Sequence, residues 1–104
     1  MIVGTVLQQP NEYLDYDIDY TAFFIANAAD QIAGGAGAGQ PGYPTAVSNP
    51  AGLTLNPQIS NDSKSVKLWV GNVQANIEYK ITITITSVNG RVKEDELILI
   101  GQDF

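Results

Sequence analysis

Three aspartates at alternate positions, Asp15, Asp17 and Asp19, have the spacing that comes closest to a known chemistry. The same spacing opens a calcium-binding loop, which also needs a glycine directly after the third ligand and a glutamate farther on. Here Tyr20 and Ala26 occupy those two positions. On an extended strand, alternate side chains lie about 7 Å apart, too far to converge on one ion. The pattern favours a solvated acidic face, and we expect no metal site.

The usual catalytic side chains are missing from this sequence. The chain has no cysteine and no histidine, which excludes thiolate chemistry and removes the commonest general base. Its eleven Asp and Glu residues offer carboxylates for a glycosidase pair, but no pattern separates an acid from a base among them. The glycine-rich residues 34–39 lack the Gly-Lys-Ser/Thr ending of a phosphate-binding loop. We therefore expect no enzyme activity and no cofactor.

The overall charge argues against several classes of partner. Eleven acidic residues against five basic ones give a net charge of −6, and the basic residues do not cluster along the sequence. Nucleic acid and anionic membranes are themselves negative, so both are expected to be repelled. Residues 1–9 have no basic start and no cleavage site, and predict neither a signal peptide nor a membrane span. We expect a soluble, acidic protein.

The last quarter of the chain has the clearest structural pattern. Residues 77–85 alternate isoleucine or tyrosine with polar residues, a period of two that is typical of a strand. An Asn-Gly pair at residues 89–90 then supplies the positive-φ dipeptide of a tight hairpin. A two-residue loop would place Glu94 on the isoleucine face, so we predict one additional loop residue, with the glycine in the left-handed region. That register puts Ile83 opposite Leu97.

Shorter segments bounded by turn residues predict further strands at residues 2–7, 14–21, 52–56 and 65–70. Whether the third of these continues past Pro57 to residue 60 stays open on the sequence. Residues 22–32 have no clean period and indicate a strand end or a short helical turn. The Gly-, Ala- and Pro-rich residues 33–44 predict an extended or mobile loop. The predicted fold is all-β: one immunoglobulin-like (Ig-like) antiparallel β-sandwich with Greek-key connections, forming a single domain over residues 1–104.

Exposed aromatic and apolar residues are the remaining candidates for function. Trp69 is expected on the face of its strand opposite the apolar residues. It therefore either covers the edge of the sandwich or projects as an interface anchor. Tyr79, near the start of the longest strand, is placed to hydrogen-bond back to a loop carbonyl, as a tyrosine corner does. We expect a protein interface at Trp69, Tyr43, Ile2, Val3, Val6 and Leu7.

Several short motifs resemble those of small virion proteins of tailed bacteriophages, the fibre–tail adaptors near the head–tail connection. They are DYDIDYT at 15–21, ADQI at 29–32, LWV at 68–70, ITIT at 83–86 and Gly-Arg at 90–91. The resemblance covers about residues 10 to 100. It implies a non-enzymatic, Ig-like structural protein that forms a multi-copy ring and links the tail or neck to fibres. The implied partners are tail, neck and fibre proteins, and the implied location is the virion, assembled in the host cytoplasm.

Two other functions stay open on the sequence. Within the structural class, the chain is also compatible with a capsid-decorating or head-closure protein. From a different class, a carbohydrate-binding module would use aromatic rings as stacking platforms, at Tyr13, Tyr16, Tyr20, Tyr43 and Trp69. We expect Tyr16 and Tyr20 to face inward, which weakens the carbohydrate-binding hypothesis.

Overall fold

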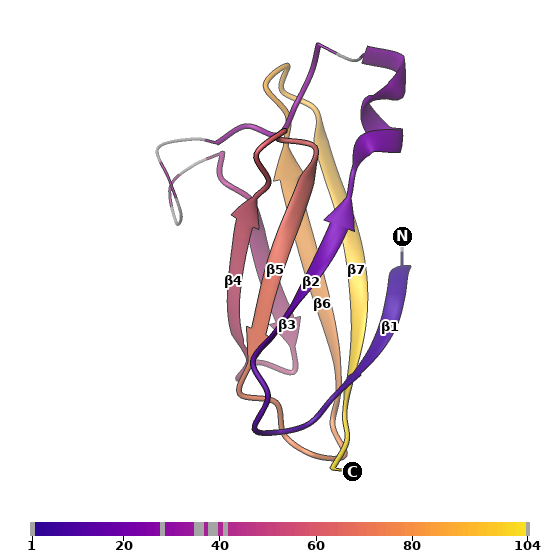
Figure 1. Ribbon diagram of the computed structural model, residues 1–104, viewed down its shortest axis with the longest axis vertical. Helices are drawn as coiled ribbons and strands as arrows, with labels where there is room; N and C mark the ends of the chain where they lie inside the picture. The colour runs from indigo at the N-terminus through magenta and orange to yellow at the C-terminus, as the bar shows by residue number, and fades with distance from the viewer. Residues whose placement is uncertain (1, 28, 35–36, 38–39, 41, 104) are drawn as a thin grey trace.

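The computed structural model describes every residue except 1, 28, 35–36, 38–39, 41 and 104, and consists of two facing β-sheets (Figure 1). Its strands are β1 (Ile2–Gln8), β2 (Leu14–Asp19), β3 (Thr45–Asn49), β4 (Thr54–Ile59), β5 (Ser65–Gly71), β6 (Glu78–Thr86) and β7 (Val92–Gly101). A short 3₁₀-helix, η1 (Thr21–Asn27), follows β2. The predicted all-β sandwich is therefore confirmed, and residues 22–32 begin with a helical turn rather than with more strand.

The strands form a four-stranded sheet in the order β1-β7-β6-β3 and a three-stranded sheet in the order β2-β5-β4. β1 runs parallel to β7, and the other pairs are antiparallel. In Figure 1, η1 lies beyond the upper end of the sandwich, and the chain turns from β1 into β2 at the lower end. The sequence did not predict β3, whose residues have no strong alternating pattern.

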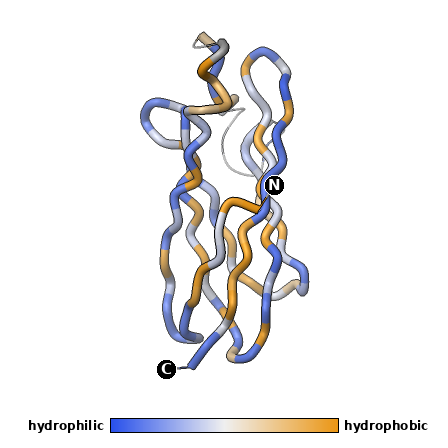
Figure 2. The backbone as a smooth tube through the Cα atoms, turned by 90° about the vertical axis from the view of Figure 1, so that its right-hand side faces the viewer, coloured by the Kyte–Doolittle hydropathy of each residue, from blue (hydrophilic) through white to orange (hydrophobic). Residues whose placement is uncertain are grey.

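The two sheets share one hydrophobic core. β5 contributes three fully buried residues, and β6 contributes three that face them across the sandwich; these are Val66, Leu68, Val70, Ile81, Ile83 and Ile85. Figure 2 shows hydrophobic residues along the strands and hydrophilic residues at the turns of the lower end. The faces predicted from the alternation on β5 and β6 are therefore correct, with Lys67 and Trp69 on the outer face of β5.

The β6–β7 hairpin has a different register from the predicted one. Ile81, not Ile83, lies opposite Leu97, and Ile83 lies opposite Asp95. The loop does contain one additional residue and Gly90 has a φ of 86°, as predicted. However, the additional residue precedes the Asn-Gly pair instead of following it, because Ser87 N–H bonds to Arg91 C=O. The predicted and observed registers differ by two positions, so every side chain keeps its predicted face.

Tyr79 forms the predicted tie to the preceding loop, but with its hydroxyl as the acceptor. The N–H of Gln74 donates to Tyr79 Oη at 3.2 Å, whereas a bond to a carbonyl was expected. The predicted loop at 33–44 falls partly outside the described residues. At its start, Ala33 N–H donates to Thr86 C=O, which attaches this part of the segment to β6.

Candidate protein interface

β1 carries four of the six predicted interface residues. Ile2 and Leu7 are 60% and 50% exposed, and Val3 is also exposed, whereas Val6 packs against the core. β1 belongs to the protein's own sheet, where its parallel pairing with β7 satisfies one backbone edge. Gln8 at its end is fully buried, and its amide donates to Val70 C=O at 2.8 Å. The strand is thus both a part of the fold and an exposed apolar surface.

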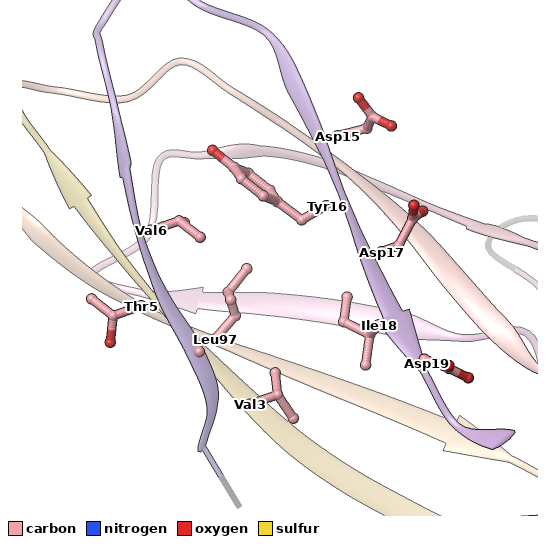
Figure 3. A pocket seen from close by; sticks show the side chains of 10 residues that line it. Val3, Thr5, Val6, Asp15, Tyr16, Asp17, Ile18, Asp19 and Leu97 are labelled. Carbon is pink, nitrogen blue, oxygen red and sulfur yellow. The ribbon is translucent and has the colours of Figure 1, made fainter. Parts of the chain in front are cut away.

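A groove of about 480 Å³ separates β1 from β2, at one edge of the sandwich. Figure 3 shows that Val6, Tyr16, Ile18 and Leu97 point into the space between the two strands. Tyr16 is held there because its hydroxyl donates to Gln8 Oε1 at 2.7 Å. Burial, followed by the nearby acidic groups, raises the pKa of this phenol. The groove therefore has an apolar floor with a fixed tyrosine along one wall.

The three alternating aspartates lie on the outer face of β2, pointing away from β1 (Figure 3). Lys67 on β5 lies between two of them, with Nζ 2.8 Å from Asp15 and 3.3 Å from Asp17. Hydrogen bonding from Lys67 lowers the pKa of Asp15, and the same contacts raise the pKa of Lys67. Asp19 accepts bonds from the N–H and hydroxyl of Thr21 at the start of η1. Among the described residues, no group of three acidic side chains is placed to hold a metal ion.

Trp69 lies on the outer face of the three-stranded sheet, stacked against Tyr13. Their ring centroids are 5.3 Å apart and the ring planes differ by 21°. Trp69 Nε1 also donates to Gln58 Oε1 at 3.2 Å. Gly71 makes room for the stack, since a Cβ there would come within 2.6 Å of Tyr13 Cδ1. Because β5 is the central strand, Trp69 does not cover the sandwich edge as one prediction had it.

Tyr43 lies apart from the other predicted residues, beside a second groove of about 280 Å³ that involves β3 and β4. In Figure 1 these strands are at the opposite side of the molecule from β1. The structure therefore brings Val3 and Val6 together with β2, but it does not join Tyr43 or Trp69 to that surface. Of the other tyrosines, Tyr20 is buried and Tyr16 is half-buried, as predicted.

Basic side chains gather at the upper end of the sandwich, although the sequence shows no such cluster. Arg91 Cζ lies 4.4 Å from the centre of the Phe23 ring, and Lys64 Nζ lies 4.7 Å from that of Phe24. Lys93 Nζ is also within 5.8 Å of the Phe23 ring. These three basic residues, which do not cluster along the sequence, therefore lie together in the fold. Arg91 and Lys93 nevertheless bond to buried carboxylates, so the cluster fastens η1 to the hairpin rather than forming a bare basic patch.

Comparison with known proteins agrees with the motifs. The family model described as podophage GP4 fiber-tail adaptor protein gp77 matches residues 8–100. The chain belongs to this family. A search of curated proteins gave no match. In the described part of the chain, no helix is both long and apolar enough to cross a membrane.

Membership in the adaptor family makes the chain a structural component of a phage virion, one that contacts other tail or fibre proteins. Two family-like motifs that are distant in sequence also meet in the fold. Asp30, in the motif at 29–32, receives two hydrogen bonds from Arg91, in the motif at 90–91. Reasoning from sequence missed this pair and the Tyr13–Trp69 stack, because neither contact leaves a local spacing pattern.

Proposed function

We propose that the chain is a non-enzymatic adaptor that links the tail or neck of a phage particle to its fibres as part of a multi-copy ring. The observation that carries the proposal is the family match over residues 8–100. Exposed apolar side chains on β1 and the outer stack of Tyr13 on Trp69 support it, because such residues form the centres of protein interfaces. Assembly in the host cytoplasm follows from this role.

We further propose that residues 1–104 form a single Ig-like domain. The strand neighbours β2-β5-β4 and β3-β6-β7 are those of the Ig constant-type sandwich, with strands taken in chain order. The Tyr79 bond to Gln74 near the start of β6 also supports this assignment, since Ig domains have a tyrosine corner there. The first strand is the departure from the constant type, because β1 pairs with β7 instead of β2.

The adaptor function can be tested by complementing a phage whose own copy of the gene is disrupted. Deleting β1 would remove a strand of the sheet, so the test uses Leu7→Ser and Trp69→Ala, which change outward-facing side chains. Val47→Ser, at an exposed position on β3, is the matched control. Each variant is first checked for thermal unfolding, and its abundance in purified virions is then measured.

We expect the wild-type chain in several copies between tail and fibres in a cryo-EM map, with Leu7→Ser and Trp69→Ala folded but depleted from virions at least about tenfold. Val47→Ser should be incorporated normally. Density on the head surface or at the head–tail closure would support decoration or head closure instead. Normal incorporation of both variants, with a soluble glycan protecting Trp69 fluorescence from quenching, would favour carbohydrate binding.

A further inference from the structure

β2 is an open edge of the three-stranded sheet. Within the described chain, its one neighbour in that sheet is β5. The N–H of Tyr20 bonds to the C=O of Lys64, which fixes the residues of β2 that bond toward β5. Hydrogen-bonded and non-hydrogen-bonded pairs alternate along an antiparallel pair of strands. The backbone N–H and C=O groups of Asp15, Asp17 and Asp19 therefore point away from β5. They face the side of β2 on which the groove beside β1 opens.

The opposite edge of the same sheet is blunted. On β4, Ser60 N–H bonds to Ser65 C=O, and the same alternation leaves Pro57 pointing away from β5. Proline has no N–H to offer an added strand, and proline on an edge strand is a common protection against pairing. β2 has no proline in its six residues. The sheet therefore presents one protected edge and one that still offers backbone donors.

The two faces of β2 differ in chemistry. Toward the core, Ile18 and the half-buried Tyr16 line the groove together with Val6 of β1. Toward solvent, the three aspartates carry three negative charges against the single positive charge of Lys67. A strand added beside β2 would alternate its side chains between these faces. Its inward residues would meet apolar side chains and its outward residues would meet carboxylates.

We propose that the groove beside β2 binds an extended segment of a partner protein in which basic and branched apolar residues alternate. The segment adds a fourth strand to the sheet, with main-chain hydrogen bonds to β2. The outward aspartates select the partner by charge, because opposite charges paired across strands attract and like charges repel. The same row disfavours pairing of β2 with β2 of a second copy, because the aspartates of the two strands would face one another. This inference rests on the proposed adaptor function only for the source of the segment, which would be another virion protein.

The position is also vacant for a topological reason. In an Ig constant-type sandwich the first strand pairs with the second, completing the sheet on this side. Here β1 pairs with β7 and its register begins with Ile2 opposite Glu96. The first strand therefore leaves the flank of β2 uncovered, and the groove lies there.

The test uses the purified chain and three fluorescein-labelled octapeptides. One alternates lysine and valine, one alternates glutamate and valine, and one has the same lysines and valines in two blocks. Fluorescence anisotropy measures binding, and amide NMR maps it. We expect the alternating basic peptide to bind, the acidic peptide not to bind, and the block peptide to bind at least about tenfold more weakly. Amides of Asp15, Asp17 and Asp19 should shift and gain protection from exchange.

Variants of the protein distinguish the effect of charge from the effect of main-chain pairing with β2. Asp17→Lys should lower the affinity for the alternating basic peptide about tenfold and allow the acidic peptide to bind. Glu78→Lys makes the same charge change at an exposed position of β6, and should alter affinity less than about twofold. Asp17→Pro removes an outward N–H that is not bonded to β5, and should abolish binding without preventing folding. If that variant does not fold, the Asp17→Lys and NMR results decide.

Equal binding of the alternating and block peptides would overturn the inference, since that result means attraction without strand addition. An equal loss of peptide affinity in Asp17→Lys and Glu78→Lys would also overturn it. So would protection from amide exchange that is confined to β1. The outcome is distinct from that of the adaptor test. If peptides fail to bind while Leu7→Ser and Trp69→Ala are lost from virions, the adaptor function stands and the groove inference fails. If the peptide binds but the chain is absent from virions, the reverse holds.

Discussion

Arg91 donates two hydrogen bonds to one carboxylate oxygen of Asp30, at 3.0 and 2.9 Å, across 61 positions of sequence. The Asp30 side chain has no exposed surface, whereas the Arg91 side chain is 38% exposed. The backbone N–H groups of Gln31 and Asn89 also donate to Asp30. The pair therefore joins the segment after η1 to the tip of the β6–β7 hairpin, and it stabilises the end of the sandwich that carries the most cations.

The first prediction concerns acid stability. Burial alone raises the pKa of Asp30, but hydrogen bonds from Ser87, Asn89 and Arg91 outweigh it and hold the pKa at about 2, below the ordinary 3.8. A carboxyl group whose pKa is lower in the folded state than in the unfolded state stabilises the native protein above about pH 4. This stabilisation is lost as the pH falls toward 2. Asp30→Asn should therefore lower stability at pH 7 and reduce the difference in stability between pH 7 and pH 3.

Urea unfolding at both pH values measures that difference, and Glu94→Gln, at an exposed position on β7, is the control. The control should keep the wild-type dependence on pH. If Asp30→Asn unfolds like wild type at pH 7, Asp30 has no stabilising role in the pair.

The second prediction compares two buried tyrosines. Tyr20 is 2% exposed, and its hydroxyl has no hydrogen-bond partner among the described residues. Burial, with a smaller contribution from Asp95, raises the pKa of Tyr20, so its phenol stays neutral. A buried hydroxyl without a partner costs about 1–3 kcal/mol, whereas a typical hydrogen bond contributes about 1 kcal/mol. Tyr20→Phe should therefore raise the free energy of unfolding by about 1 kcal/mol.

Tyr79→Phe is the matched change, because the Tyr79 hydroxyl accepts a bond from Gln74 N–H. It should lower the free energy of unfolding by about 1 kcal/mol, measured in the same denaturant titration. Destabilisation of similar size in both variants would show that Tyr20 Oη has a bonding partner in solution.

The side-chain alternation of the strands predicted most of the fold correctly. On β5 and β6 the branched apolar side chains face the core, because burial of one face fixes which residues point inward. The length of a hairpin loop is set differently, by which residues close the turn. Both a residue before the Asn-Gly pair and one after it satisfy the alternation, so the pattern could not choose between them.

The candidate site was predictable only in part. The apolar pattern of β1 indicated its exposed residues, but not that Val3 and Val6 line a groove against β2. The acidic row was visible as a spacing, and its relation to Lys67 was not, because that contact joins residues 52 positions apart. The same limit applies to Phe23, whose ring lies under Arg91 only after the chain has folded. Local periodicity reports which face a residue occupies, and tertiary packing decides its partner.

The third prediction concerns the hairpin turn. Gly90 has a φ of 86°, and a Cβ built there meets no atom within 4 Å. Any loss of stability on substitution therefore comes from the backbone conformation. The left-handed region costs an ordinary L residue about 1–2 kcal/mol. Gly90→Ala should lower the free energy of unfolding by about 1 kcal/mol, and Gly90→Asn by less, since asparagine tolerates this region. Equal losses in thermal unfolding would contradict a purely conformational origin.

The last prediction concerns calcium. Asp15 and Asp17 both contact the Lys67 ammonium, and carboxylates at alternate positions of a strand stay about 7 Å apart. A calcium ion needs six to eight oxygen ligands at about 2.3–2.6 Å, which this row cannot supply. The midpoint of thermal unfolding should therefore be the same with millimolar calcium as with a chelator, at matched ionic strength. A ligand that binds the native state raises the midpoint progressively with its concentration. An upward shift that grows with calcium and is absent with magnesium would reveal a calcium site, and Asp17→Asn would then show whether the acidic row forms it.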